Sequence, residues 1–217
     1  MKIIDISVPL SRDLPTWPDV RQYEVEWTSR KNLVNGKQAV GSSFQMCTHH
    51  GTHMDAPYHF DPQGITIDQI DPHLLVGPCR LYEYHGTGHI GRAELEAMGV
   101  TDGLRVLIKT GNSRIVRSQT FHENYIALKP DAIQYLLDKG VRLLGFDYFS
   151  IGPYGVGNDE SHYLFLSRGG VIIETIDLSA VPPGQYQIMA LPIKMAGLDG
   201  APARVLLAEK DGEENPK

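Results

Sequence analysis

The 217-residue sequence is poor in cysteine and lacks any long apolar or basic run. Its two cysteines, Cys47 and Cys79, can form at most one disulfide. Neither belongs to a Cys-x-x-Cys pair, so a zinc ribbon and a dithiol redox site are both excluded. We therefore expect free, structural thiols.

The missing runs also exclude two classes of partner. No apolar stretch approaches the ~20 residues that span a bilayer, and Asp5 stands where a signal peptide needs its apolar core. The chain has 20 basic and 26 acidic residues, a formal net charge of −6, and no stripe of lysine or arginine that could neutralise a phosphate backbone. The sequence predicts a soluble cytoplasmic protein with no membrane and no nucleic-acid partner.

What the sequence does contain is a pattern of short elements. Its 22 glycines and 14 prolines favour tight turns, and 41% apolar residues suffice for one core at this length. We predict a single, strand-rich mixed α/β domain over residues 1–210, followed by a flexible polar tail at 211–217. Period-two patterns predict strands near 2–10, 23–27, 40–48, 79–84, 105–109, 142–147, 171–176 and 186–191. Capping signals and apolar periodicity predict helices near 92–98, 130–139 and 159–167.

Histidine is concentrated in one segment of the chain. Four of the nine histidines and one aspartate fall between residues 49 and 59, which is denser than chance or core packing accounts for. Residues of one parity share a side of an extended chain. Those of the same parity in this segment are His49, His53, Asp55 and His59.

A straight strand cannot gather these side chains around one ion. At ~3.3 Å per residue, the six steps from His49 to Asp55 span roughly 20 Å, whereas the ligands of one ion lie a few ångströms apart. The chain must therefore bend between His49 and His53. Gly51 can adopt backbone angles that are closed to other residues, and Pro57 excludes a continuous helix.

The residue types in this segment indicate metal chemistry. Two imidazoles and a carboxylate suit zinc, manganese or iron, and three protein ligands leave a coordination position for water. Because a metal acidifies such a water and polarises a carbonyl, hydrolysis of an acyl bond is the natural reaction. His59 is the candidate proton carrier, since imidazole titrates near the working pH. The alternative, which the spacing favours less, is that these are packed or surface histidines.

A second ion would need further ligands. Glu174 interrupts the apolar run 171–176, where an unpaired carboxylate is costly unless it meets a cation or a donor network. Asp159, Glu160 and His162, on the predicted helix before it, are further candidates. A neutral buried glutamate or a salt bridge is the alternative, and spacing alone does not link these residues to the first cluster.

The same segment carries a family signature, His49-x-Gly51-Thr52-His53-x-Asp55-x-Pro57-x-His59-Phe60. It resembles that of the cyclase family of metal-dependent hydrolases, which includes bacterial kynurenine formamidases and isatin hydrolases. The resemblance extends over most of the chain, including the stretch Asp199-Gly200-Ala201-Pro202-Ala203-Arg204. It implies a swivelling β/β/α fold and a homo-oligomer, commonly a dimer. It also implies the roles of the site. One divalent ion, zinc or manganese, would be held by His49, His53 and Asp55, and a second, where present, by Asp55, His162 and Glu174, with His59 as general acid/base.

Chemistry and resemblance together predict a metal-dependent amidohydrolase that cleaves a carbon–nitrogen bond of a small aromatic amide, linear or cyclic. The formamidase pattern has a Trp-Asp pair before a Phe in mid-chain, whereas residues 119–125 here read Gln-Thr-Phe-His-Glu-Asn-Tyr, so N-formylkynurenine is not specified. Trp17, Tyr148 and Phe149 are candidates for an aromatic pocket. Two alternatives stay open: a non-catalytic member that binds metal or ligand, and lactone-type ring opening or closure.

Overall fold

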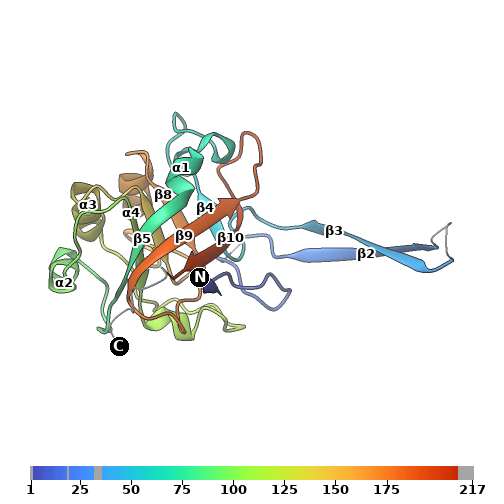
Figure 1. Ribbon diagram of the computed structural model, residues 1–217, viewed down its shortest axis with the longest axis horizontal. Helices are drawn as coiled ribbons and strands as arrows, with labels where there is room; N and C mark the ends of the chain where they lie inside the picture. The colour runs from blue at the N-terminus through green and yellow to red at the C-terminus, as the bar shows by residue number, and fades with distance from the viewer. Residues whose placement is uncertain (1, 19, 32–35, 210–217) are drawn as a thin grey trace.

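The protein is built around one large mixed sheet that closes on itself. The structure, a computed structural model, describes residues 2–18, 20–31 and 36–209, so the predicted tail lies outside the described residues. The strand order of this sheet is β1-β10-β4-β8-β7-β6-β5-β9, and β9 also pairs with β10. All strands of this sheet except β1 therefore belong to a closed ring (Figure 1). The strands are β1 (Ile3–Asp5), β4 (His53–Asp55), β5 (Val76–Glu83), β6 (Arg105–Lys109), β7 (Leu143–Phe146), β8 (Val171–Glu174), β9 (Gly184–Pro192) and β10 (Gly200–Ala208).

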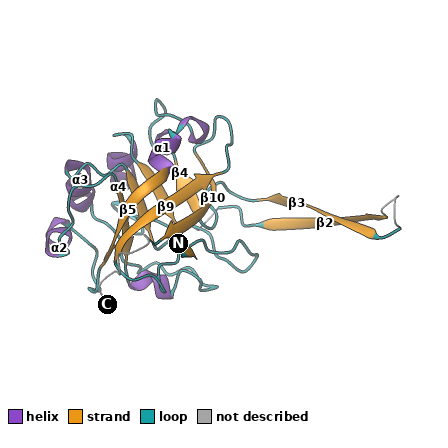
Figure 2. Cartoon of the chain, in the orientation of Figure 1, coloured by secondary structure: helices purple, strands orange, loops and turns teal. Residues whose placement is uncertain are grey.

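Strand direction divides the ring into two parts. Strands β5, β6, β7 and β8 run parallel, while β4, β9 and β10 pair antiparallel with their neighbours. This arrangement confirms the predicted strand-rich mixed sheet. The helices stand beside the ring (Figure 2) and are α1 (Pro72–Leu75), α2 (Arg92–Ala97), α3 (Pro130–Asp138), α4 (Asn158–Leu166) and the 3₁₀ helices η1 (Pro57–His59), η2 (Ile67–Gln69) and η3 (Gly111–Arg114). None of the described helices has the length and apolarity to cross a membrane.

The parallel strands face a core on each side. In β6, Val106 and Ile108 belong to the cluster that contains the buried face of α3, whereas Leu107 belongs to the cluster inside the ring. This alternation follows from the two-residue period of a strand. The strands are apolar throughout because both faces are covered, as parallel sheets require.

Several predicted strands differ in extent from those observed, and two observed strands, β4 and β10, were not predicted. The strand predicted over 2–10 is regular only at Ile3–Asp5 and continues as the isolated bridge between Ser7 and Ile176. The strand predicted over 40–48 is β3 (Gln38–Gln45), which ends before the histidine segment. The pattern also missed β10, because glycine and proline at its start are typical of turns, yet β10 pairs with β1, β4 and β9.

A two-stranded arm projects from the body of the molecule. It consists of β2 (Glu24–Lys31) and β3, which pair only with each other among the described strands (Figure 1). In its register Val25 faces Phe44 and Trp27 faces Ser42, so the apolar side chains share one face while Glu24 and Glu26 occupy the other. Trp27 is 69% exposed and Phe44 57%. The arm is therefore an amphipathic ribbon whose apolar face is uncovered by its own chain in the described structure.

Candidate metal centre

Two adjacent strands form the floor of the candidate site. His53 and Asp55 lie on β4, and His53 stands directly opposite Glu174 of β8 in the antiparallel register. Opposite residues of paired strands have side chains close together. As a result, His53 Nε2 lies 3.2 Å from Asp55 Oδ1 and 3.4 Å from Glu174 Oε2, and all three residues are buried.

The predicted bend brings His49 back to this floor. Gly51 has a φ of 68°, which confirms that the chain turns there through the left-handed region. A side chain at Gly51 would also collide with Leu10. The turn places His49 Nδ1 2.7 Å from Asp55 Oδ1, although the two residues are six positions apart.

The second predicted group of ligands joins the same cluster. His162 lies on α4, and its Nε2 atom is 3.1 Å from Glu174 Oε1, which also accepts a hydrogen bond from the Ile151 amide. Spacing could not link these residues to His53, but the β4–β8 register does. Asp159 and Glu160 lie exposed in the first turn of α4, and neither belongs to a potential ligand group found among the described residues.

His59 forms the rim of the cluster, together with a residue that sequence reasoning did not single out. Its ring stacks on that of His49, with centroids 4.1 Å apart, and its side chain is 28% exposed. Asp199 lies beside both rings, and its Oδ2 atom is 2.8 Å from His49 Nε2 and 3.3 Å from His59 Nδ1. The only sequence signal for Asp199 was its place in the family-like stretch 199–204.

The protonation of two histidines provides a test of whether the cluster fits a cation. The Nδ1 atoms of His53 and His162 lie 2.8 Å from the carbonyl oxygens of Gly51 and Asn158, so each donates its hydrogen there and, in the neutral ring, carries a lone pair on Nε2. Both lone pairs then face carboxylate oxygens, and His53 Nε2 is buried without a hydrogen-bond partner among the described residues. Such a lone pair and a carboxylate oxygen repel each other unless a proton or a metal cation lies between them, and imidazole and carboxylate donors gathered in this way fit a divalent metal.

Potential ligand atoms among the described residues form two groups, which include His59 but not His162. Within each group the ligand atoms lie within 4.8 Å of one another, and both groups contain Asp55. A carboxylate shared between two groups is suited to bridge two ions. The groups are His49, Asp55 and His59, and His53, Asp55 and Glu174.

Without a cation, the carboxylates hold protons on the histidines. Burial lowers the pKa of His49, but the charge of Asp55 and the hydrogen bond to Asp199 outweigh it and raise this pKa to about 11. For His53, burial is again outweighed by Asp55, and the pKa rises to about 9. Burial raises the pKa of Asp55, yet the adjacent charges of His49 and His53 hold it well below 3.8.

The stability of the metal-free protein should therefore decrease in alkali. A raised histidine pKa stabilises the fold fully below its unfolded value of 6.5, and this stabilisation is lost as pH rises through about 9 and about 11. The lowered pKa of Asp55 stabilises the fold above pH 3.8, and this stabilisation is lost in acid. We expect the unfolding midpoint of chelator-treated protein to fall from pH 6.5 to pH 9, and calorimetry will measure it.

Added metal should reverse this trend. Metal ligation needs unprotonated imidazoles, so the gap between the midpoints of loaded and metal-free protein should widen as pH rises. A midpoint of the metal-free protein that climbs steadily across the same range would contradict the assignment of these pKa shifts.

An aromatic cluster adjoins the candidate site. Trp17 packs edge-on against Phe121 with their ring centroids 5.4 Å apart, and the Phe121 ring centroid lies 5.9 Å from those of Tyr148 and Phe149. The carbonyl of Tyr148 accepts a hydrogen bond from the amide of Thr175, the residue after Glu174. The aromatic residues predicted from sequence are thus brought together next to β8, but Tyr148 and Phe149 are buried in the core, and Trp17 packs partly buried against them.

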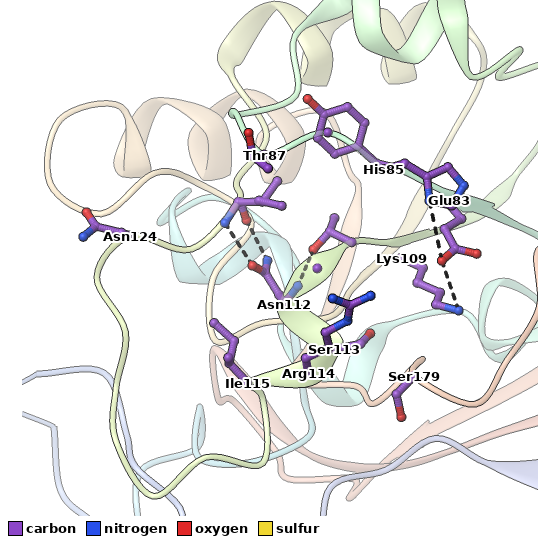
Figure 3. A pocket seen from close by; sticks show the side chains of 15 residues that line it. Glu83, His85, Thr87, Lys109, Asn112, Ser113, Arg114, Ile115, Asn124 and Ser179 are labelled. Atoms are coloured by element: carbon purple, nitrogen blue, oxygen red, sulfur yellow. Dashed lines mark hydrogen bonds and ion pairs between the residues drawn. The ribbon is translucent and has the colours of Figure 1, made fainter.

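A cavity of about 550 Å³ lies elsewhere, at the ends of β5 and β6 (Figure 3). His85 lines it, as do Glu83 and Lys109, which form an ion pair at 3.3 Å. Asn112 is engaged through both side-chain atoms with the backbone of Ile126. None of the clustered histidines lines this cavity, so we do not place the chemistry there.

Comparisons with known proteins agree with this geometry. The family model "Cyclase", described as "Putative cyclase", matches residues 4–153. The kynurenine formamidase of Bacillus thuringiensis (strain Al Hakam) is 34% identical over 206 residues, 94% of this chain and 96% of the relative. A solved structure described as a predicted metal-dependent hydrolase from Bacillus stearothermophilus has a TM-score of 0.78 and 33% identity, over 95% of this chain and 97% of that one. Isatin hydrolase A from Ralstonia solanacearum shares the fold, with a TM-score of 0.81 at 22% identity over 96% and 92% of the two chains.

Proposed function

The chain belongs to the cyclase family, and from this premise we propose that it is a metal-dependent hydrolase that cleaves the carbon–nitrogen bond of a small aromatic amide. The observation that carries the proposal is the pair of imidazole lone pairs, on His53 and His162, that face buried carboxylates. The similarity to a kynurenine formamidase supports an amide as substrate, and the aromatic cluster around Trp17 and Phe121 supports an aromatic one.

The proposed ligands follow the two sides of the cluster. His49, His53 and Asp55 would hold one ion, and Asp55, His162 and Glu174 a second, with zinc or manganese as the metal. Imidazole and carboxylate ligands suit both metals. Bound there, a divalent cation supplies Lewis acidity toward an amide carbonyl and lowers the pKa of a water.

We assign proton transfer to His59. It lies on the rim, partly exposed, with its Nδ1 atom toward Asp199 and its ring stacked on that of a proposed ligand. This leaves Nε2 as the ring nitrogen that can take a proton from the attacking water and pass it to the departing nitrogen. An amide needs this step because an amine leaves only when protonated.

Metal analysis and a substrate panel test the proposed function. We expect the purified protein to hydrolyse N-formyl anilines, to lose this activity when a chelator removes the metal, and to regain it with zinc or manganese. The panel should include isatin and simple lactones. Turnover of lactones alone would favour ring chemistry, and metal binding without turnover of any substrate would favour a non-catalytic binding protein.

We also propose that the chain acts in the cytoplasm, where its two free cysteines would stay reduced.

The β2–β3 arm supports a further proposal, that the chain forms a homo-oligomer through this arm. A two-stranded ribbon is marginally stable alone, and a contiguous apolar face such as that of Val25, Trp27 and Phe44 marks an interaction surface. Packing against a second copy would bury each arm face, and twofold symmetry would form every contact twice.

Substitution on the apolar face of the arm should weaken this assembly. We expect the protein to elute as a multiple of its 24.1 kDa chain mass. Trp27→Glu should shift it to the monomer by weakening association about 30-fold or more, the cost of losing a buried aromatic anchor. The control Glu26→Gln, on the opposite face, should leave the mass unchanged. Light scattering will measure both, and a monomeric unmodified protein would contradict the proposal.

A further inference from the structure

Asp199 is a carboxylate to which the proposed reaction has assigned no role. It stands directly before Gly200, the first residue of β10. Its Oδ2 atom lies 2.8 Å from His49 Nε2 and 3.3 Å from His59 Nδ1. A single carboxylate oxygen therefore faces a proposed metal ligand and the proposed proton carrier at the same time.

The backbone holds this carboxylate in place. The carbonyl oxygen of Asp199 accepts a hydrogen bond from the Ala56 amide at 2.9 Å, and Gly200 pairs with Asp55 in the register of β10 and β4. The Thr48 hydroxyl lies 3.4 Å from Asp199 Oδ1, on the other side of the carboxylate. Asp199 is thus anchored to the strand that carries Asp55, so its position relative to the ligand cluster is set by the sheet.

The neighbouring glycine lets the His49 ring reach the carboxylate. A Cβ atom at Gly200 would lie 2.8 Å from His49 Cε1 and 2.8 Å from the carbonyl oxygen of Met54, closer than real Cβ atoms approach other atoms. Because Gly200 has no side chain, the His49 ring packs on the backbone of β10. Gly200 and Asp199 together form a seat for this ring.

The carboxylate also determines which ring nitrogens carry hydrogen. An ionised carboxylate accepts hydrogen bonds and donates none, so Asp199 favours hydrogen on His49 Nε2 and on His59 Nδ1. His49 Nδ1, which lies 2.7 Å from Asp55 Oδ1, then carries the lone pair that can bind a metal. His59 Nε2 is then the lone pair that can accept a proton.

We propose that Asp199 is a positioning residue that fixes the tautomer and the orientation of His49 and His59, and so couples metal binding to proton transfer. The inference rests on the proposed function for the roles of the two histidines. It assigns Asp199 no contact with substrate. Its carboxylate acts through the two rings, as carboxylates behind metal-binding histidines do.

Nitrogen NMR on the zinc-loaded full chain tests the inference without any need for turnover. Spectra of the imidazole ¹⁵N nuclei report which ring nitrogen carries hydrogen. We expect His49 and His59 each to show one tautomer in the unmodified protein, and Asp199→Asn and Asp199→Ala to show mixtures. Zinc affinity, measured by chelator competition, should fall about 10- to 100-fold in both variants. On formanilide, kcat should fall while KM stays within about twofold.

A matched control separates this role from a structural one. Asp68 accepts a hydrogen bond from the Gly197 amide, in the same connection between β9 and β10, and Asp68→Asn perturbs that connection without touching either histidine. The inference is overturned if Asp68→Asn changes the spectra as Asp199→Asn does, or if Asp199→Ala keeps both tautomers and its zinc affinity. Should the unmodified protein hydrolyse no amide, the proposed function fails, while the spectra and affinities still decide the role of Asp199.

Discussion

Replacement of His53 by alanine is expected to remove both the bound metal and the amide hydrolysis. Among the described residues, His53 is the one whose Nε2 atom lies within 3.4 Å of carboxylates on two strands, Asp55 of β4 and Glu174 of β8. Loss of a residue behind a ligand already costs about 10- to 100-fold in metal affinity or activity, so loss of the ligand itself should cost at least about 100-fold in each. Elemental analysis and steady-state rates on formanilide will measure the two effects.

Folding must be controlled in that experiment, because His53 is fully surrounded by protein. Removing it leaves two buried carboxylates without their cationic partner, which is destabilising. The partly exposed ligand His49 offers a second variant, His49→Asn, which should lose metal with less damage to the fold. His85→Ala is the matched control, since the His85 side chain is exposed and lines the other cavity. Full activity of either ligand variant in demonstrably metal-free protein would refute the assignment.

Replacement of His59 by alanine should have the opposite combination of effects, with metal retained and turnover lost. His59 is assigned to proton transfer, and a positioned acid or base contributes about 10²- to 10⁴-fold to rate. We expect kcat on formanilide to fall by that amount, with zinc content unchanged. Tyr58→Phe, which alters the exposed neighbour on the same 3₁₀ helix, should leave kcat near its original value.

The chemistry of the leaving group sharpens this prediction. An aryl ester expels a phenolate without needing a proton, whereas an anilide requires protonation of nitrogen. His59→Ala should therefore lose far more activity toward formanilide than toward a formate ester of a phenol. An equal loss toward both substrates would instead show that His59 acts on the attacking water or on the metal and not on the leaving group.

The sequence predicted how His49, His53 and Asp55 come together, because these residues are close along the chain and their arrangement depends on local geometry. Shared parity placed His53 and Asp55 on one side of a strand, and the need to bring His49 back required a bend at Gly51, where φ is 68°. Glu174 is a single carboxylate within an apolar run, so it was expected to pair with a cation or a donor network. Each of these inferences used only neighbours along the chain.

The distant part of the site could not be derived in this way. His162 meets Glu174 because α4 packs beside β8, and Glu174 meets His53 because β8 and β4 pair in one register. Neither fact is encoded in a local period, and only the family resemblance had joined these residues. Asp199 was harder still, because it precedes a strand that begins with Gly200, Ala201 and Pro202 and therefore resembles a turn.

The closure of the ring at β4 has a consequence for how the protein resists degradation. This three-residue strand joins β8 to β10 through three residue pairs on each side, and among the other links of the ring only β7–β8 is as short. Because such links have few backbone hydrogen bonds, their opening would expose the buried strand to amide exchange and to proteases. Two of the proposed ligands, His53 and Asp55, lie on β4, and Glu174 lies on β8, so a bound ion would hold these two strands together. Cells short of the metal would then clear the protein faster, and its abundance would follow metal supply.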